Sequence, residues 1–150
     1  MPQSPLLLRR LLRAKDKMDA SPHEAWPIER LAEASAVSTA YFAREFKKAF
    51  GLPPHRYLLT RRIERATALL RETDLPITDI ALQTGWTSLG TFGRIFRDIT
   101  NESPGELRTR TQAAADHARH VPECVMRNAQ RPNLISAVLE KRRSKATGKL

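Results

Sequence analysis

One segment of this chain occurs twice, and the second copy follows about fifty residues after the first. The first copy runs through "PIERLAEASAVS" and "YFAREFKKAFGLPP", and the second runs through "PITDIALQTGWTS" and "TFGRIFRDITNESP". Both copies are expected to adopt the same local fold, and two copies are too few to build a solenoid. The matched positions are Pro27/Pro76, Ile28/Ile77, Leu31/Ile80, Ala32/Ala81, Phe42/Phe92, Arg44/Arg94, Phe46/Phe96, Lys47/Arg97, Gly51/Asn101 and Pro54/Pro104.

The first copy predicts a helix, a tight turn and a second helix. Leu31 and Ala32 face inward from a helix over residues 28–35. In the second helix, Phe42 and Phe46 recur at the spacing of one buried stripe, which Ala49 or Phe50 continues. A serine N-cap precedes this helix, and a glycine followed by two prolines ends it. These boundary residues are Ser38, Gly51, Pro53 and Pro54.

The second copy carries the same signals. Gly85 breaks its first helix, and Ser88 caps its second helix. Asn101 takes the place of the glycine, because asparagine is the next most tolerant residue at positive φ. Pro104 then opens a last helix, which we expect to reach about His120. The expected core residues of this copy are Ile77, Ile80, Ala81, Trp86, Phe92, Phe96 and Ile99.

The sequence between the copies predicts one long helix over residues 54–72. Leu59, Ile63, Ala66 and Leu70 form its single apolar face. A helix of this length extends roughly 28 Å. A second amphipathic helix is predicted by "LLLRRLLRAKDKM" near the start of the chain.

We therefore expect an all-α fold. Two helix-turn-helix subdomains are joined by a long linker helix, and a basic C-terminal extension follows them. The expected segments are an N-terminal helix and loop at 1–26, a first helix-turn-helix unit at 27–53, the linker helix at 54–72, a second unit with its closing helix at 73–120, and a basic, partly disordered tail at 121–150.

The chain is strongly basic, with a formal net charge of +10 and a pI of about 10.6. Such an excess indicates nucleic acid or an acidic membrane surface as the partner. No apolar run approaches the length of a membrane span. The basic amphipathic helix at the start is expected to cover the first unit rather than to bind a membrane, because a small all-α domain needs that cover. We expect a cytoplasmic, nucleoid-associated protein with no membrane partner.

Residues for catalysis or metal binding are not apparent in the sequence. Cys124 is the single cysteine and has no cysteine or histidine neighbour at metal-ligand spacing. Paired carboxylates, a phosphate-binding loop and a nucleophile constellation are also missing from the pattern. We expect no enzymatic activity, no cofactor and no metal.

The outward side of the second helix in each copy is the candidate functional surface. One such face is equally compatible with a solvated basic helix and with a recognition helix in a DNA major groove. Two matching faces favour DNA, because small residues let the backbone approach base edges and Arg44 can grip a guanine through two hydrogen bonds. The outward positions are Thr39, Ala40, Ala43, Arg44, Lys47 and Lys48 in the first copy, and Leu89, Gly90, Thr91, Gly93, Arg94 and Arg97 in the second.

The linker length suits two such helices on one duplex. B-DNA presents the same groove on the same face every ~34 Å. A rigid helix of roughly 28 Å can hold two recognition helices about one turn apart. We expect a monomer that reads two adjacent major-groove segments, with DNA bending that costs on the order of 1–6 kcal/mol if the fit is imperfect. A non-specific or architectural DNA binder that relies on the basic tail is the alternative.

These residues resemble the AraC/XylS family of bacterial transcription regulators. "RRIERATALLRETDLPITDIALQTGWTSLGTFGRIFRDITNESPGELR" is similar to the family signature, and "LAEASAVSTAYFAREFKKAFGLPPHRYL" is similar to the family's first unit. The resemblance covers about residues 28–108. It implies two helix-turn-helix subdomains that bind double-stranded DNA and control promoters, with RNA polymerase as a further partner. The matching residues include Arg62, Ile63, Ala66, Leu69, Leu70, Ile77, Ile80, Ala81, Gly85, Trp86, Ser88, Phe92, Arg94, Phe96, Ser103 and Pro104.

Positions carried over from the family define the expected contacts. The resemblance implies base contacts at Thr39, Ala40, Ala43 and Arg44, and at Leu89, Gly90, Thr91, Gly93 and Arg94. Phosphate contacts are expected at Ser38, Lys47, Lys48, Arg61, Ser88 and Arg97.

Several residues depart from the family pattern. Trp86 stands where phenylalanine is usual, and Leu107 stands where tyrosine is usual. Gly90 and Gly93 lie inside the second recognition helix, where each costs roughly 0.5–1 kcal/mol against alanine. We infer that the second unit reads sequence weakly, or reads it through DNA shape and the thymine methyl group.

Many family members carry a separate effector-binding or dimerisation domain. Residues 1–26 are too few to form one, so the sequence resembles the short, stand-alone members. We expect its activity to be controlled through protein abundance or through a partner.

Overall fold

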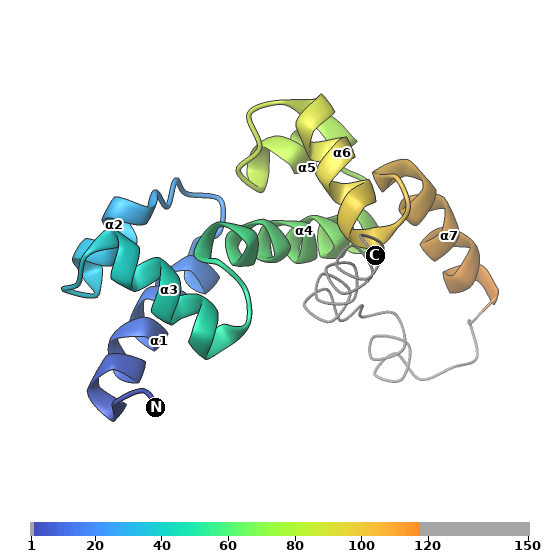
Figure 1. Ribbon diagram of the computed structural model, residues 1–150. Helices are drawn as coiled ribbons and strands as arrows, with labels where there is room; N and C mark the ends of the chain where they lie inside the picture. The colour runs from blue at the N-terminus through green and yellow to red at the C-terminus, as the bar shows by residue number, and fades with distance from the viewer. Residues whose placement is uncertain (1, 118–150) are drawn as a thin grey trace, which may run out of the picture. The chain divides into compact units, whose positions relative to one another are not determined.

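The computed structural model describes residues 2–117, and every regular element within that range is an α-helix. The prediction of an all-α fold is confirmed. The chain divides into two compact units between Arg62 and Ile63, inside the fourth helix, and we call these parts unit 1 and unit 2. The helices are α1 Pro5–Ala20, α2 Ile28–Ala34, α3 Thr39–Phe50, α4 Pro54–Glu72, α5 Ile77–Gln83, α6 Leu89–Thr100 and α7 Pro104–His117 (Figure 1).

Some expectations fall beyond this range. The basic tail at 121–150, Cys124 and the last turn of the closing helix up to His120 lie outside the described residues. The helix predicted over residues 54–72 is present as α4 with those bounds. That this helix holds two DNA-reading helices about one helical turn of DNA apart stays a prediction.

The core of unit 1 is built around aromatic side chains of α3. Phe42 and Phe46 are fully buried, and their ring centres lie 5.5 Å apart. The Phe46 ring also lies 4.7 Å from that of Phe50 and 5.7 Å from that of Tyr57. The predicted stripe is thus confirmed as core, which leaves the opposite side of α3 exposed. Apolar residues of the neighbouring helices complete this core: Leu7, Leu11, Ala14, Met18, Leu31, Ala32 and Leu58.

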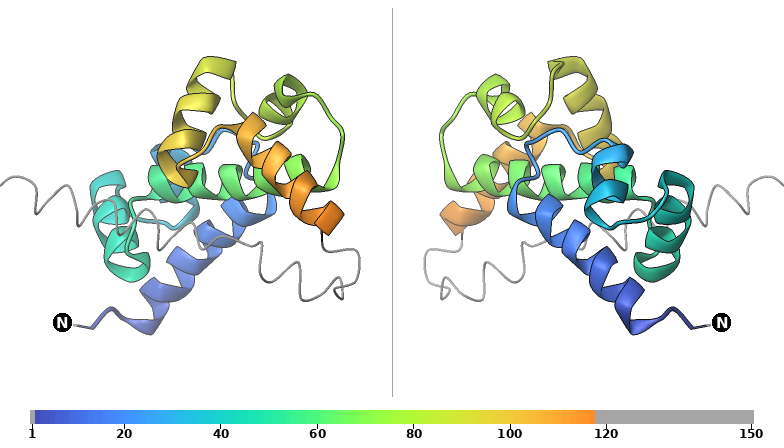
Figure 2. Two further views of the ribbon diagram at one scale, coloured as in Figure 1. Left: turned by 90° about the vertical axis from the view of Figure 1, so that its right-hand side faces the viewer. Right: turned by 90° about the vertical axis from the view of Figure 1, so that its left-hand side faces the viewer.

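Helix α1 belongs to unit 1, because the apolar face of this amphipathic helix packs into the core of that unit. The Ser4 hydroxyl accepts a hydrogen bond from the Leu7 N–H at 3.2 Å and so caps the helix. Leu11 and Met18 are fully buried, whereas Leu12 on the outer side is 44% exposed. The helix packs against both α2 and α3 (Figure 2). The expectation that its leucine face covers the first helix-turn-helix unit is confirmed.

Unit 2 repeats this arrangement around α6. Phe92 and Phe96 are fully buried with ring centres 5.6 Å apart, and Trp86 lies under the turn with its ring centre 5.6 Å from that of Phe92. The Trp86 indole N–H is buried and finds no hydrogen-bond partner among the described residues. Ile99 of α6 is buried as well, and other helices contribute the remaining buried apolar residues: Ile63, Ala66, Leu70, Ile80, Ala81 and Leu107.

The turns of the two units use left-handed backbone at matching positions. Between the paired helices, Ala36 has φ 56° and Gly85 has φ 94°. After α3 and α6, Gly51 has φ 82° and Asn101 has φ 69°. Both helix-ending residues predicted from the sequence are therefore confirmed. Ala36 and Asn101 thus carry side chains in a conformation that only glycine reaches without cost, and asparagine tolerates it better than alanine does.

Candidate nucleic-acid interface

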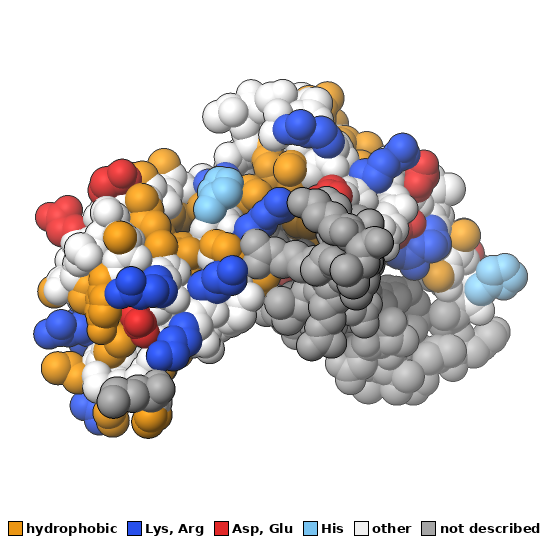
Figure 3. All heavy atoms as spheres, in the orientation of Figure 1, with side chains coloured by type: hydrophobic (Ala, Val, Ile, Leu, Met, Phe, Trp, Pro, Cys, Tyr) orange, Lys and Arg blue, Asp and Glu red, His pale blue; other side chains and the backbone are white. Residues whose placement is uncertain are grey.

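Helix α3 presents a polar face opposite its phenylalanines. The Ser38 hydroxyl accepts a hydrogen bond from the Tyr41 N–H at 3.3 Å and so caps the helix, as predicted. Lysine and arginine side chains gather over this helix (Figure 3). Small residues lie near its beginning and positive charges near its end, where they also interact favourably with the helix dipole. The exposed residues are Thr39, Ala40, Tyr41, Arg44, Lys47 and Lys48, and Ala43 is half-buried.

Helix α6 presents the corresponding face in unit 2. Its cap is the same, since the Ser88 hydroxyl accepts a hydrogen bond from the Thr91 N–H at 3.3 Å. A β-carbon added at Gly93 would meet nothing within 4 Å, and one added at Gly90 would meet only the Ser88 hydroxyl at 3.7 Å. Packing among residues 2–117 therefore requires neither glycine. The exposed residues are Leu89, Gly90, Thr91, Arg94 and Arg97, and Gly93 is half-buried.

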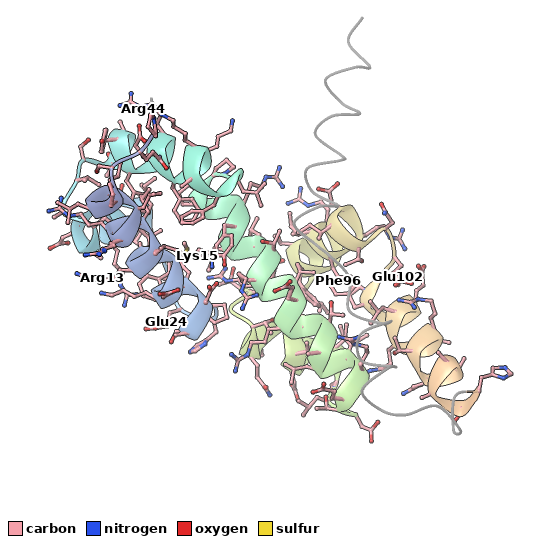
Figure 4. All side chains as sticks on the ribbon, turned by 90° about the horizontal axis from the view of Figure 1, so that it is seen from below. Arg13, Lys15, Glu24, Arg44, Phe96 and Glu102 are labelled. Atoms are coloured by element: carbon pink, nitrogen blue, oxygen red, sulfur yellow. The ribbon has the colours of Figure 1, made fainter. Side chains whose placement is uncertain are left out.

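Arg44 and Arg94, the matched arginines of the two helices, have different neighbours. The Arg44 Nε lies 3.8 Å from Oε1 of Glu45, and its guanidinium carbon lies 5.6 Å from the centre of the Tyr41 ring. The Gln3 side-chain amide donates to Oε2 of Glu45 at 2.6 Å. Figure 4 labels Arg44 on the outer side of α3. No ion pair or ring contact of Arg94 is found among the described residues.

Arg97 carries an ion pair on the surface of unit 2. Its Nη2 lies 3.1 Å from Oε1 of Glu106, and the two side chains are 63% and 58% exposed. Exposed pairs of this kind contribute about 0–1 kcal/mol. Arg97 can therefore exchange Glu106 for a phosphate at little cost.

Arg61 lies away from the face of α3. Its Nε is 3.0 Å from Oδ1 of Asp19, and its side chain is 32% exposed. The same carboxylate accepts a hydrogen bond from the Tyr57 hydroxyl at 2.5 Å and one from the Lys15 ammonium at 3.1 Å. Arg61 therefore joins α4 to α1 within unit 1, and its predicted contact with DNA phosphate stays a prediction.

Three further arginines form hydrogen bonds within their own unit. Arg62 donates to two backbone carbonyls of the 21–27 loop at 2.7 and 2.8 Å. Burial lowers the pKa of its guanidinium, which stays protonated as arginine does throughout proteins. In unit 2, Arg108 donates to two carbonyls at the end of α4 at 3.3 and 3.2 Å. A side-chain hydrogen bond to Glu102 raises the pKa of Arg110.

The described part of the chain shows neither a metal-ligand cluster nor a membrane-spanning helix. Residues 2–117 contain no group of three or more histidine, cysteine, aspartate or glutamate side chains arranged to hold a metal ion. Over the same residues, no helix is both long enough and apolar enough to cross a membrane.

Sequence reasoning missed three residues around Arg44. Tyr41 was left out of the expected contacts although it matches Thr91, which was included, and it is exposed one helical turn before Arg44. The match between Tyr41 and Thr91 in the duplicated sequence could therefore have identified Tyr41 as a candidate contact. The approach of Gln3 to Glu45 left no signal, because the two residues are separated by 42 positions and meet only through the packing of α1 on α3.

The duplicated units define the class of protein: a tandem pair of helix-turn-helix units, each with an exposed second helix. A family profile described as "Helix-turn-helix domain" matches residues 31–110, which is more than half of the chain. The chain belongs to the AraC/XylS family of helix-turn-helix transcription regulators.

Curated relatives agree with this assignment. An uncharacterized HTH-type transcriptional regulator of Staphylococcus aureus (strain COL) is 33% identical over 117 residues, which cover 74% of this chain and 16% of that protein. The HTH-type transcriptional regulator MtrA of Neisseria gonorrhoeae is 31% identical over 100 residues, which cover 67% of this chain and 33% of MtrA. The chain thus spans only a minor part of the length of these relatives.

Solved structures show the same fold. The DNA-binding domain of AdpA, a global transcriptional factor crystallised with a target DNA, matches with a TM-score of 0.68 and 27% identity over 70% of this chain and 95% of that chain. An AraC-type regulator from Chromobacterium violaceum matches with a TM-score of 0.65 and 31% identity, over 69% of this chain and 93% of that chain.

Proposed function

We propose that this protein is a sequence-specific transcription regulator that binds double-stranded DNA by inserting α3 and α6 into two segments of the major groove. The observation that carries the proposal is the pair of exposed helix faces with an arginine at the same position in each, Arg44 and Arg94. The AdpA domain, which has the same fold, was crystallised on its target DNA. A regulator of this kind acts on the nucleoid, in the cytoplasm.

The proposed contacts divide into two groups by their chemistry. Residues along the middle of each face read bases: an arginine forks onto guanine, and small or apolar side chains meet base edges and the thymine methyl group. Residues at the caps and toward the ends of α3 and α6, together with Arg61 of α4, hold phosphates and so position the protein without reading sequence. The base contacts are Thr39, Ala40, Ala43, Arg44, Leu89, Gly90, Thr91, Gly93 and Arg94, and the phosphate contacts are Ser38, Lys47, Lys48, Arg61, Ser88 and Arg97.

One chain is sufficient for the proposed reading. Because each unit carries its own second helix, a monomer supplies what helix-turn-helix dimers supply with two chains. The site is then asymmetric, since the faces of α3 and α6 differ in sequence. Bound at a promoter, the protein recruits or blocks RNA polymerase.

The test is a selection of bound duplexes from a random DNA library with the full chain. The expected result is one asymmetric motif with two blocks centred about 10 base pairs apart, the length of a helical turn. A non-specific or architectural binder gives no enriched motif and an affinity for all duplexes that falls steeply with salt. That outcome would overturn sequence-specific regulation in favour of the alternative.

A further inference from the structure

We infer that Glu45, held in place by Gln3, orients Arg44 so that the two terminal nitrogens of its guanidinium point at a guanine. Glu45 is thus a positioning residue that sets the specificity of unit 1 by acting through Arg44. The inference deepens the proposed function and rests on it, because it requires α3 to lie in a major groove.

Glu45 is held before any ligand arrives. Its side chain is only 12% exposed, although it lies on a helix whose neighbouring positions face solvent. The Gln3 amide donates to its carboxylate at 2.6 Å and to its backbone carbonyl at 2.9 Å. Two hydrogen bonds from one amide to one residue leave the carboxylate little freedom, so its negative charge stands at a defined place beside Arg44.

The contacts of Arg44 restrict its orientation and leave its tip free. The carboxylate lies on the Nε side of the guanidinium at 3.8 Å, and the Tyr41 ring lies 5.6 Å from its central carbon. The side chain as a whole is 71% exposed. Two neighbours near the base of the guanidinium narrow the range of orientations that binding must later restrict. The terminal nitrogens remain available for the O6 and N7 acceptors of guanine.

Unit 2 provides an internal comparison. Both second helices have 12 residues, the same serine cap and a left-handed residue at their ends. At the positions that match Tyr41 and Glu45, however, unit 2 has Thr91 and Ile95. Neither side chain can act as a carboxylate or an aromatic partner for Arg94. The orienting device is therefore particular to unit 1, and we expect unit 1 to discriminate bases more strictly.

The charge of Glu45 gives the inference a distinctive signature. A carboxylate on a DNA-facing helix repels phosphate and lowers affinity for every duplex, while by orienting Arg44 it raises discrimination between duplexes. Removing the charge should therefore move these two quantities in opposite directions. If Glu45 only stabilised the fold, its substitution would lower the affinity for the selected motif and the affinity for a random duplex together.

The experiment compares the full chain with its E45Q variant on three duplexes: the motif recovered from the library selection, that motif with the Arg44-dependent base pair replaced, and a random duplex, all at one salt concentration. We expect Glu45→Gln to raise affinity for the random duplex about two- to fivefold, since it removes one close repulsive charge. We expect it to lower discrimination at the replaced base pair about three- to tenfold.

Three further variants keep the result interpretable. Glu33→Gln, which removes the same charge from an exposed position on α2, should leave discrimination unchanged. Gln3→Ala should lower discrimination without the gain in non-specific affinity. In an Arg44→Ala background, Glu45→Gln should no longer affect discrimination, because a positioning residue acts only through its target.

The outcomes separate this inference from the function on which it rests. A selection without any enriched motif overturns the proposed function, and the inference falls with it. A clear motif whose Arg44-dependent position is not a G·C pair overturns the inference alone. The inference also fails if Glu45→Gln leaves discrimination intact, or if Glu45→Gln still lowers discrimination after Arg44 has been removed.

Discussion

Arg44 and Arg94 occupy matching positions of the duplicated sequence, but the side chains around them differ. Arg44 has Tyr41 and Glu45 beside it, whereas α6 offers two glycines and few groups that can hydrogen-bond bases. We predict that Arg44→Ala costs more specificity than Arg94→Ala, with a loss of about 1–3 kcal/mol at the base pair that Arg44 reads. Titrations across single-base variants of the selected motif measure both losses. Equal or reversed losses would contradict the ranking.

Substitution of Gly93 by alanine should change the stability of the protein and its affinity for DNA in opposite directions. Because a β-carbon there meets nothing within 4 Å, Gly93→Ala should raise the free energy of unfolding by about 0.5–1 kcal/mol. The same methyl group should weaken binding to the selected motif, since it stands between the backbone and the base edges. Urea denaturation and DNA titration measure the two effects. The matched control is Ala43→Gly in unit 1, which should lower stability without creating a steric obstacle; unchanged binding by Gly93→Ala would refute the close-approach role.

Ala36 has a strained left-handed backbone, whereas Gly85, at the matching position of the second copy, adopts this conformation without strain. Both residues have positive φ in the turn between the paired helices, at 56° and 94°. An alanine in left-handed backbone is strained by roughly 1–2 kcal/mol, partly offset by the entropy that glycine loses on folding. We predict that Ala36→Gly stabilises unit 1 by up to about 1 kcal/mol and that Gly85→Ala destabilises unit 2 by a similar amount. Ala34→Gly, at the end of α2, is the control and should be destabilising; urea midpoints for the three variants decide the question.

At the scale of elements, α1 is part of unit 1. Adjacent leucines on this helix have opposite environments, since Leu11 is fully buried and Leu12 is 44% exposed. We predict that Leu11→Ala lowers the free energy of unfolding by about 2–5 kcal/mol, whereas Leu12→Ala changes it by less than about 0.5 kcal/mol. Chemical denaturation of both variants measures the difference. Similar effects for the two leucines would show that α1 does not dock through this face.

The local elements were largely predictable because their signals act within a few residues. The caps at Ser38 and Ser88, the left-handed ends at Gly51 and Asn101, and the helix over 54–72 all lie where the sequence indicated. The caps and the left-handed ends appear in both copies, so the second copy tests the interpretation of the first. Ala36 was missed, because an alanine at positive φ has no signature of its own and only its match to Gly85 points to it.

The candidate interface was predictable in outline and not in detail. The inward turn of the phenylalanines implies which residues of α3 and α6 face outward, and all of those residues are exposed or half-buried. The partners of Arg61 and Arg44 were not foreseen. Arg61 meets Asp19, and Arg44 has a neighbour held by Gln3, because α1 packs on the unit in a way that no local period encodes.

At the scale of the whole molecule, each unit has its own buried aromatic pair and its own exposed second helix. Two units that contact separate base pairs should contribute independently to binding. We predict that the losses in binding free energy from Arg44→Ala and Arg94→Ala add in the double variant to within about 0.5 kcal/mol. Titrations of the four proteins against the selected motif measure this. A larger departure would show that the units engage DNA cooperatively.

The sequence by itself determined the duplicated local architecture of this protein. Helix periodicity, caps, prolines and residues of positive φ act over one or two turns, so they can be read without knowing what packs against them. Only the tertiary structure decided which distant side chains meet: Gln3 with Glu45, and Asp19 with Tyr57 and Arg61. Those contacts depend on how α1 seats against α3 and α4, and the energy of that packing is shared among many side chains rather than encoded at any single position.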